Sequence, residues 1–255
     1  MKIRVLGCHH TETATTRLST LLINDQVAVD AGAITSTLSA AEQAQVTSVL
    51  ITHHHYDHVR DLLTLALGGY GSGATVSVFS TSETLSFLQD NYLSGRLYPD
   101  FTKMPDPPRL RLVTLEADSQ YEVEGLTVTP VRVQHGVPAV GYHISADDGS
   151  GLFCTGDTGG GFGEILERIR PELLISEVTF SNSQESFARL THHMTPKLLE
   201  QELEPLVRTG HGPRSVLAIH MNTAAESKIR AELALVAEKL QLQITPAYEG
   251  MVLEV

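Results

Sequence analysis

A run of metal-binding side chains follows directly on an apolar stretch near residue 50. The stretch Ser48–Thr52 is typical of a buried β-strand. The next six residues are His53, His54, His55, Tyr56, Asp57 and His58. They form the pattern His-x-His-x-Asp-His, in which His54 and Tyr56 are spacers. Imidazoles this close to one another repel when they are protonated, whereas a divalent cation uses their lone pairs. The pattern therefore predicts a metal site at the end of this strand.

Length and composition are those of an ordinary globular protein. The chain has 255 residues, of which 42% are hydrophobic and 19% charged, and we expect a single domain over residues 1–255. The apolar runs are too short to cross a bilayer, and Met1–Gly7 is expected to be a strand rather than a signal peptide. We therefore expect a cytoplasmic protein with no membrane partner. Cys8 and Cys154 each end a strand-like run and are expected to be buried thiols rather than a disulfide framework.

The net charge of −12 limits the partners. A general nucleic-acid-binding protein would carry a basic face, so we expect no strong nucleic-acid binding. An anionic substrate stays compatible with the acidic balance, because bound dications reverse the local field.

Strand-like and helix-like runs alternate along the whole chain. Strands are predicted at 2–7, 20–30 (a hairpin), 48–52, 75–79, 126–134, 152–156, 172–176, 215–219 and 251–255. Helices are predicted near 38–45, 58–67, 81–94, 163–170, 195–208 and 223–240. Two packed sheets with helices outside would bury these runs, so we predict an α/β protein with a four-layer αββα sandwich.

Three further candidate ligands stand where an apolar strand meets a loop. A two-metal site needs about seven protein ligands, and the first motif supplies four of them. His135 follows the run at 131–134, Asp157 follows the run at 152–156, and His220 follows the run at 216–219. Together these residue types suit a pair of divalent metal ions, with zinc favoured and manganese or iron as alternatives.

These residues together resemble the metallo-β-lactamase superfamily over essentially the whole chain. The resemblance rests on the His-x-His-x-Asp-His loop, on Asp30-Ala31-Gly32 after the hairpin, and on the later ligands in order. It implies that one metal is bound by His53, His55 and His135. It implies that the other is bound by Asp57, His58 and His220, and that Asp157 bridges both. A homodimer is compatible with the superfamily.

A narrower resemblance is to the class II cyclic-nucleotide phosphodiesterases. Gly156-Asp157-Thr158-Gly159 looks like that family's Gly-Asp-Thr-Gly, Glu177-Val178-Thr179-Phe180-Ser181-Asn182 is similar to its Glu-Val-Ser-Phe-Pro-Asn, and His193-Met194-Thr195-Pro196 resembles its His-Leu-Thr-Pro. The resemblance implies hydrolysis of a cyclic nucleotide, similar to 3′,5′-cyclic AMP, or of a similar small anionic phosphodiester.

Catalytic roles follow from this interpretation. A hydroxide activated by two metals would attack phosphorus, and Asp57 would help to orient it. The departing alkoxide needs a proton, for which His193 is the candidate donor and His192 the competing one. Glu177 is expected to hydrogen-bond His193 and keep it protonated, because a neighbouring carboxylate raises the pKa of an imidazole.

Other functions of the same site stay open. They are a transfer RNA 3′-processing endonuclease, a hydrolase of a non-phosphate ester, thioester or lactone, and a non-hydrolytic metal- or oxygen-binding protein. The run Gly68–Gly73 lacks the lysine and the strand-turn-helix setting of a nucleotide loop, so we interpret it as a flexible connector. Arg109, Arg111 and Arg132 are cationic, but nothing in the sequence places them near the site.

Overall fold

Two mixed sheets, each of seven strands, lie face to face in the computed structural model, which describes residues 1–255. In spatial order the first sheet contains β14 (Val252–Glu254), β1 (Lys2–Gly7), β2 (Thr20–Ile23), β3 (Val27–Val29), β4 (Ser48–Leu50), β5 (Val76–Ser80) and β6 (Leu110–Thr114). The second contains β13 (Gln243–Pro246), β12 (Ser215–Ile219), β11 (Leu173–Glu177), β10 (Gly151–Cys154), β9 (Val140–Ser145), β8 (Leu126–Arg132) and β7 (Tyr121–Val123).

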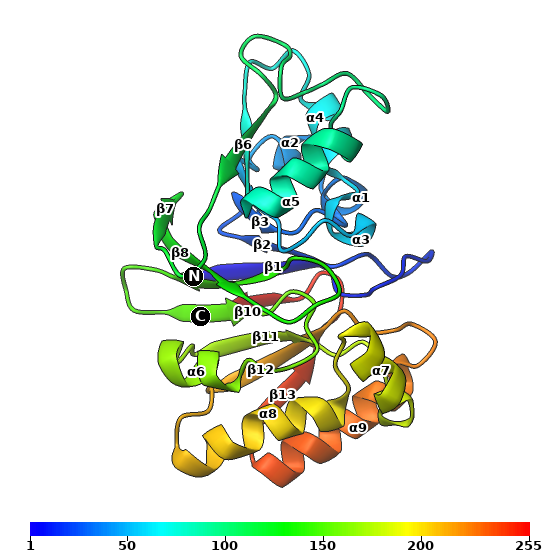
Figure 1. Ribbon diagram of the computed structural model, residues 1–255, viewed down its shortest axis with the longest axis vertical. Helices are drawn as coiled ribbons and strands as arrows, with labels where there is room; N and C mark the ends of the chain where they lie inside the picture. Colours follow the sequence, from blue (N-terminus) through cyan, green and yellow to red (C-terminus); the bar gives the residue numbers. More distant parts are fainter.

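Helices cover the outer face of each sheet (Figure 1). The first sheet carries α1 (Ile34–Thr37), α2 (Ala40–Gln43), α3 (Tyr56–Val59), α4 (Leu62–Gly68) and α5 (Ser82–Phe87), which continues as the π-helical turn η1 (Leu88–Tyr92). The second sheet carries α6 (Gly163–Ile169), the 3₁₀ turn η2 (Asn182–Gln184), α7 (Glu185–Thr191), α8 (Pro196–Thr209) and α9 (Glu226–Leu240). The predicted αββα sandwich is therefore confirmed.

Three apolar layers hold these elements together. The layer between the sheets takes side chains from both, such as Val5 and Leu50 from the first sheet and Ile175 and Leu217 from the second. A second layer packs the helices α1, α3, α4 and α5 on the first sheet, and a third packs α6 to α9 on the other. The central strands are therefore buried along nearly their whole length, because neighbouring side chains point to opposite faces and both faces are covered.

The long C-terminal helix shows how sequence sets this packing. Along α9 an apolar stripe of Ile229, Leu233, Val236 and Leu240 is buried. Glu226 and Arg230 lie on its other side, with carboxylate and guanidinium 2.7 Å apart. The helix before it, α8, starts where expected, because the Thr195 hydroxyl accepts a hydrogen bond from the Leu198 main-chain N–H. Both predicted helices are thus confirmed.

Several elements were not predicted from the sequence. They are the short strands β6, β7, β9 and β13 and the short helices α1 and α7. Cys8 and Cys154 are buried free thiols, as expected. None of the helices combines the length and the apolar character needed to cross a membrane.

The direction of the strands places the loops that matter. Strands β3, β4, β5 and β6 run parallel to one another, as do β10, β11 and β12. The loops after β3 and β4 therefore leave from one edge of the first sheet, and those after β10, β11 and β12 leave from one edge of the second. In sheets of this kind ligands bind outside the carboxyl ends of the strands.

Candidate metal centre

Seven side chains from four loops meet at the carboxyl edge of the two sheets. One group consists of His53, His55, His135 and Asp157, and a second consists of Asp57, His58 and His220. Within each group all candidate ligand atoms lie within 4.8 Å of one another. These are the seven residues that the sequence predicts as ligands, brought together from positions 53 to 220. That they bind metal stays a prediction, which the local geometry supports.

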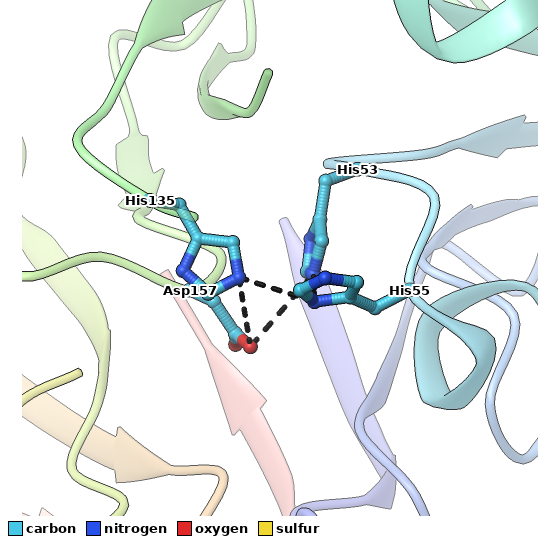
Figure 2. A group of neighbouring side chains, drawn as sticks. All are labelled: His53, His55, His135 and Asp157. Atoms are coloured by element: carbon cyan, nitrogen blue, oxygen red, sulfur yellow. Dashed lines mark hydrogen bonds and ion pairs between the residues drawn. The ribbon is translucent and has the colours of Figure 1, made fainter. Parts of the chain in front are cut away.

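The first group is a triangle of imidazoles above a carboxylate (Figure 2). Nε2 of His53 lies 2.9 Å from Nδ1 of His55, and Nε2 of His135 lies 3.2 Å from the same atom. Oδ2 of Asp157 lies 3.8 Å from His53 and 4.0 Å from His135. Three ring nitrogens that face one common point cannot all be paired by protons, so the arrangement suits a cation at that point.

The second group shares the Asp157 carboxylate with the first. Oδ2 of Asp57 lies 3.2 Å from Nε2 of His220 and 3.4 Å from Nε2 of His58. Asp157 reaches the same two rings, with Oδ2 3.4 Å from His58 and Oδ1 3.6 Å from His220. Asp157 therefore lies between both groups, in the place of a bridging ligand. His58 and His220 also hold the pKa of Asp57 well below its usual value, although burial opposes the charged form.

One buried atom shows that the residues fit a metal. Nε2 of His58 is shielded from solvent and has no hydrogen-bond partner. A buried ring nitrogen without a partner costs free energy, and a cation bound between Asp57 and Asp157 would remove that cost. Burial and the neighbouring His58 also lower the pKa of His53 well below its usual value, which favours the neutral ring that binds metals.

Hydrogen bonds behind the rings set the direction of each free nitrogen. Asp30 was not predicted as a site residue, yet its Oδ2 lies 2.7 Å from Nδ1 of His58. The same carboxylate accepts a hydrogen bond from the Thr52 hydroxyl, which lies 3.1 Å from Nδ1 of His53. With Nδ1 bonded on this side, Nε2 of both rings is left facing the centre.

A matching arrangement stands on the second sheet. The Thr179 hydroxyl donates to Glu177 over 2.6 Å and lies 2.9 Å from Nδ1 of His220. His135 is held differently, because its Nδ1 lies 3.2 Å from the main-chain oxygen of His192. Each half of the protein thus supplies a buried carboxylate and a threonine that orient the candidate ligands. For Asp30, Thr52 and Thr179 the sequence signal is only their place, one or two positions beyond a strand, whereas Glu177 is the last residue of β11.

The predicted pair of Glu177 and His193 is formed. Oε1 of Glu177 lies 2.7 Å from Nδ1 of His193. Burial opposes the charge on this ring, but Glu177 outweighs it and raises the pKa of His193 to about 9. His193 also lies 4.0 Å from Asp157. The side chain of His192 has no contact with Glu177, and its main chain supports His135 instead, so the geometry favours His193 over His192.

Comparison with known proteins gives the family. Residues 27–221 match the beta-lactamase superfamily domain. An octanoyltransferase from Porphyromonas gingivalis is 34% identical over 106 residues, which are 38% of this chain and 19% of that protein. A ribonuclease Z from Prochlorococcus marinus is 31% identical over 120 residues, which are 45% of this chain and 37% of that protein. These matches thus span well under half of each curated relative.

The fold is shared more widely than the sequence. The crystal structure of unliganded yeast PDE1 covers 100% of this chain and 99% of that chain, with a TM-score of 0.82 and 17% identity. Identity this low shows a common fold alone. The match to the family, in contrast, extends over most of the chain and includes all seven residues of the candidate centre. The chain therefore belongs to the beta-lactamase superfamily, the family of metal-dependent hydrolases that its motifs resemble.

Proposed function

We propose that this protein is a metal-dependent phosphodiesterase that hydrolyses a cyclic nucleotide, similar to 3′,5′-cyclic AMP, or a similar small phosphodiester. One observation carries the proposal. A buried Glu177 holds His193 beside the candidate metal centre, 4.0 Å from Asp157. Hydrolysis of an alkyl phosphodiester releases an alkoxide that needs a proton, and His193 would supply it.

The chain offers one ligand set for each of two divalent cations, preferably Zn²⁺, with Mn²⁺ or Fe²⁺ as alternatives. His53, His55 and His135 would hold one cation, Asp57, His58 and His220 the other, and Asp157 both. When bound, such a pair supplies a water activated near neutral pH and positive charge for the transferring phosphoryl group. The carboxylate of Asp57 is in place to orient that water.

Glu177 acts as a positioning residue for the proton donor. Its carboxylate is completely buried and accepts hydrogen bonds from the main-chain N–H groups of Thr158, Thr179 and Met194. These bonds fix the position of the carboxylate, so that it accepts a hydrogen bond from Nδ1 of His193. Nε2 of His193 is then the atom that delivers a proton to the leaving oxygen.

An aromatic surface beside His193 supports a nucleotide as the substrate. The ring of Phe180 packs edge-on against His193, with centroids 5.7 Å apart. Phe187 packs edge-on against Phe180 at 5.3 Å and is 50% exposed. An exposed ring at this place offers a nucleobase an apolar face on which to stack.

A second candidate is cleavage of transfer RNA precursors. It is favoured by the relative named ribonuclease Z, which is 31% identical over 120 residues. The net charge of −12 disfavours it, because RNA backbones are bound mainly by basic surfaces. Hydrolysis of a non-phosphate ester or lactone by the same centre is the third candidate.

A substrate panel on metal-defined protein tests the proposal. It contains cyclic AMP, cyclic GMP, a nitrophenyl phosphodiester, a transfer RNA precursor and a lactone. We expect turnover of the cyclic nucleotides and the nitrophenyl diester, and its loss in chelator. Cleavage of the transfer RNA precursor or the lactone with no turnover of the small diesters would replace the proposal with the corresponding alternative. Phe187→Ala should raise KM for the cyclic nucleotides more than for the nitrophenyl diester, with His192→Ala as a control.

A further inference from the structure

A cavity of about 210 Å³ lies at the edge of the first sheet that faces away from the candidate metal centre. Its walls include Thr47, Thr75 and Arg109, which directly precede or adjoin the starts of β4, β5 and β6. Because these three strands are parallel, their starts lie at the edge opposite to the one where His53 follows β4. Helices α2 and α4 close the outer side of the cavity, in the upper half of Figure 1. The cavity is therefore separate from the catalytic centre.

A buried guanidinium without an acidic partner faces this cavity. Arg109 is only 4% exposed, and Nη1 donates to the main-chain oxygen of Ala74. Nε is buried and has no hydrogen-bond partner. No acidic residue lines the cavity, and the carboxylate of Glu124 at this edge is bonded to Thr47 and Ser48 instead. Burial alone lowers the pKa of Arg109.

The glycine run that the sequence singles out makes room for this side chain. A Cβ atom on Gly69 would lie 2.1 Å from Nη2 of Arg109. Only glycine therefore lets the guanidinium lie this close to the end of α4. The run is thus more than the flexible connector expected from the sequence, because its second glycine fixes the place of a buried charge.

We propose that this cavity binds a small oxyanion, a carboxylate or a phosphate group with a short apolar part, through Arg109. A buried cation that lacks both an anion and a partner for Nε is costly. A carboxylate or a phosphate group supplies two acceptor oxygens in the geometry that the guanidinium fork matches. Beside the arginine the cavity is walled by Ala44, Val46, Leu65 and Val76, which suit an apolar substituent.

The experiment follows the arginine side chain itself in the intact, metal-loaded protein. The ¹⁵N signal of each arginine Nε–H group is recorded while inorganic phosphate or butyrate is added against sodium chloride of equal ionic strength. We expect the Arg109 signal to shift and saturate with at least one of the two probes. The probe that binds more tightly shows whether the cavity prefers a phosphate group or a carboxylate. The signal of Arg111, which lies two residues along β6 and is exposed, should stay unchanged. Because the readout is local, phosphate bound at the metal centre does not disturb it.

Two variants complete the test. Read from the main-chain N–H signals of Thr75 and Val76 in the cavity wall, Arg109→Gln should weaken binding about tenfold or more, since charged hydrogen bonds to the anion are lost. Arg111→Gln should bind as the wild type does. If Arg109→Gln does not fold, Gly69→Ala keeps the charge but displaces the guanidinium, and it should weaken binding as well. An Arg109 signal that neither probe shifts in the wild type would mean that the guanidinium only binds the main-chain oxygen of Ala74, and it would overturn the proposal. Equal affinity in the wild type and Arg109→Gln would do the same.

Discussion

Oε1 of Glu177 lies 2.7 Å from Nδ1 of His193, and both side chains stand at the edge of the candidate metal centre. The first sheet repeats the relationship, with Asp30 the same distance from Nδ1 of His58. In each half the carboxylate also binds a threonine hydroxyl that contacts a further histidine. The two histidines have different predicted roles, because His58 is a predicted metal ligand and His193 a predicted proton donor.

Removal of the proton donor should affect turnover but not metal content. His193→Ala should retain the metal and slow hydrolysis of diesters with poor leaving groups by roughly 10²–10⁴-fold. The rate of hydrolysis of nitrophenyl diesters, whose leaving group needs no proton, should fall much less. His192→Ala is the matched control and should behave as the wild type. Equal losses on good and poor leaving groups would remove His193 from the role.

The Glu177 carboxylate should set the upper pH limit of activity. A donor must be protonated, and its activity falls as the pH rises through its pKa. Since Glu177 raises the pKa of His193, Glu177→Gln should move the alkaline limb of the kcat profile to lower pH. The profile is measured with a poor leaving group and compared with that of His193→Ala. An unmoved alkaline limb in Glu177→Gln would contradict the coupling.

Asp30 should matter for metal affinity. Asp30→Asn keeps the shape of the side chain but weakens its hold on His58, and loss of such a supporting partner typically lowers metal affinity by about 10–100-fold. The measurement is competition with a chelator of known affinity. Asp61→Asn is the control, because Asp61 is buried nearby but bonds Thr35 and Arg60. Similar metal affinity for Asp30→Asn and wild type would show that Asp30 has no such role.

The buried His9, which is not among the candidate ligands, predicts how stability depends on pH. Nδ1 of His9 lies 2.6 Å from Glu249, and Nε2 lies 3.2 Å from Glu226. Burial opposes its charge, but the two carboxylates outweigh it and raise the pKa of His9. A raised pKa stabilises the folded state fully below the unfolded value, about 6.5, and the gain is lost as the pH rises through the folded pKa.

His9→Gln should therefore lower the free energy of unfolding more at pH 6 than at pH 10. Chemical denaturation at both pH values measures the difference against the wild type, with the metal content held constant. A loss in His9→Gln that is the same at both pH values, or larger at pH 10, would show that the ring is not charged in the folded state.

The candidate ligands could be predicted because their signal is local and chemical. His53, His55, Asp57 and His58 follow one strand within six residues, and His135, Asp157 and His220 each end an apolar run. Polar residues of metal-binding types at strand ends are uncommon enough to be noticed together. The roles of Asp30, Thr52 and Thr179 were not predicted, because an aspartate or threonine after a strand usually forms part of a turn or a helix cap. Their function appears only when separate loops meet.

The missed elements share a different cause. Strand β9 alternates Val140, Tyr142 and Ile144 with less apolar residues over only six positions, and β13 has four residues at the edge of its sheet, so the apolar signal of each is short. Helix α7 buries only Ala188 and leaves Phe187 and Leu190 exposed. Such segments are held by their neighbours rather than by their own periodicity. In contrast, α9 has a full apolar stripe and is predicted correctly.

The most direct test of the metal centre is a crystal structure of zinc-loaded protein with anomalous data collected at the zinc edge. We expect two peaks about 3.5–4 Å apart, one contacting His53, His55 and His135 and the other Asp57, His58 and His220, with Asp157 in contact with both. No peak at this place, or a fully active protein without any metal, would contradict the account.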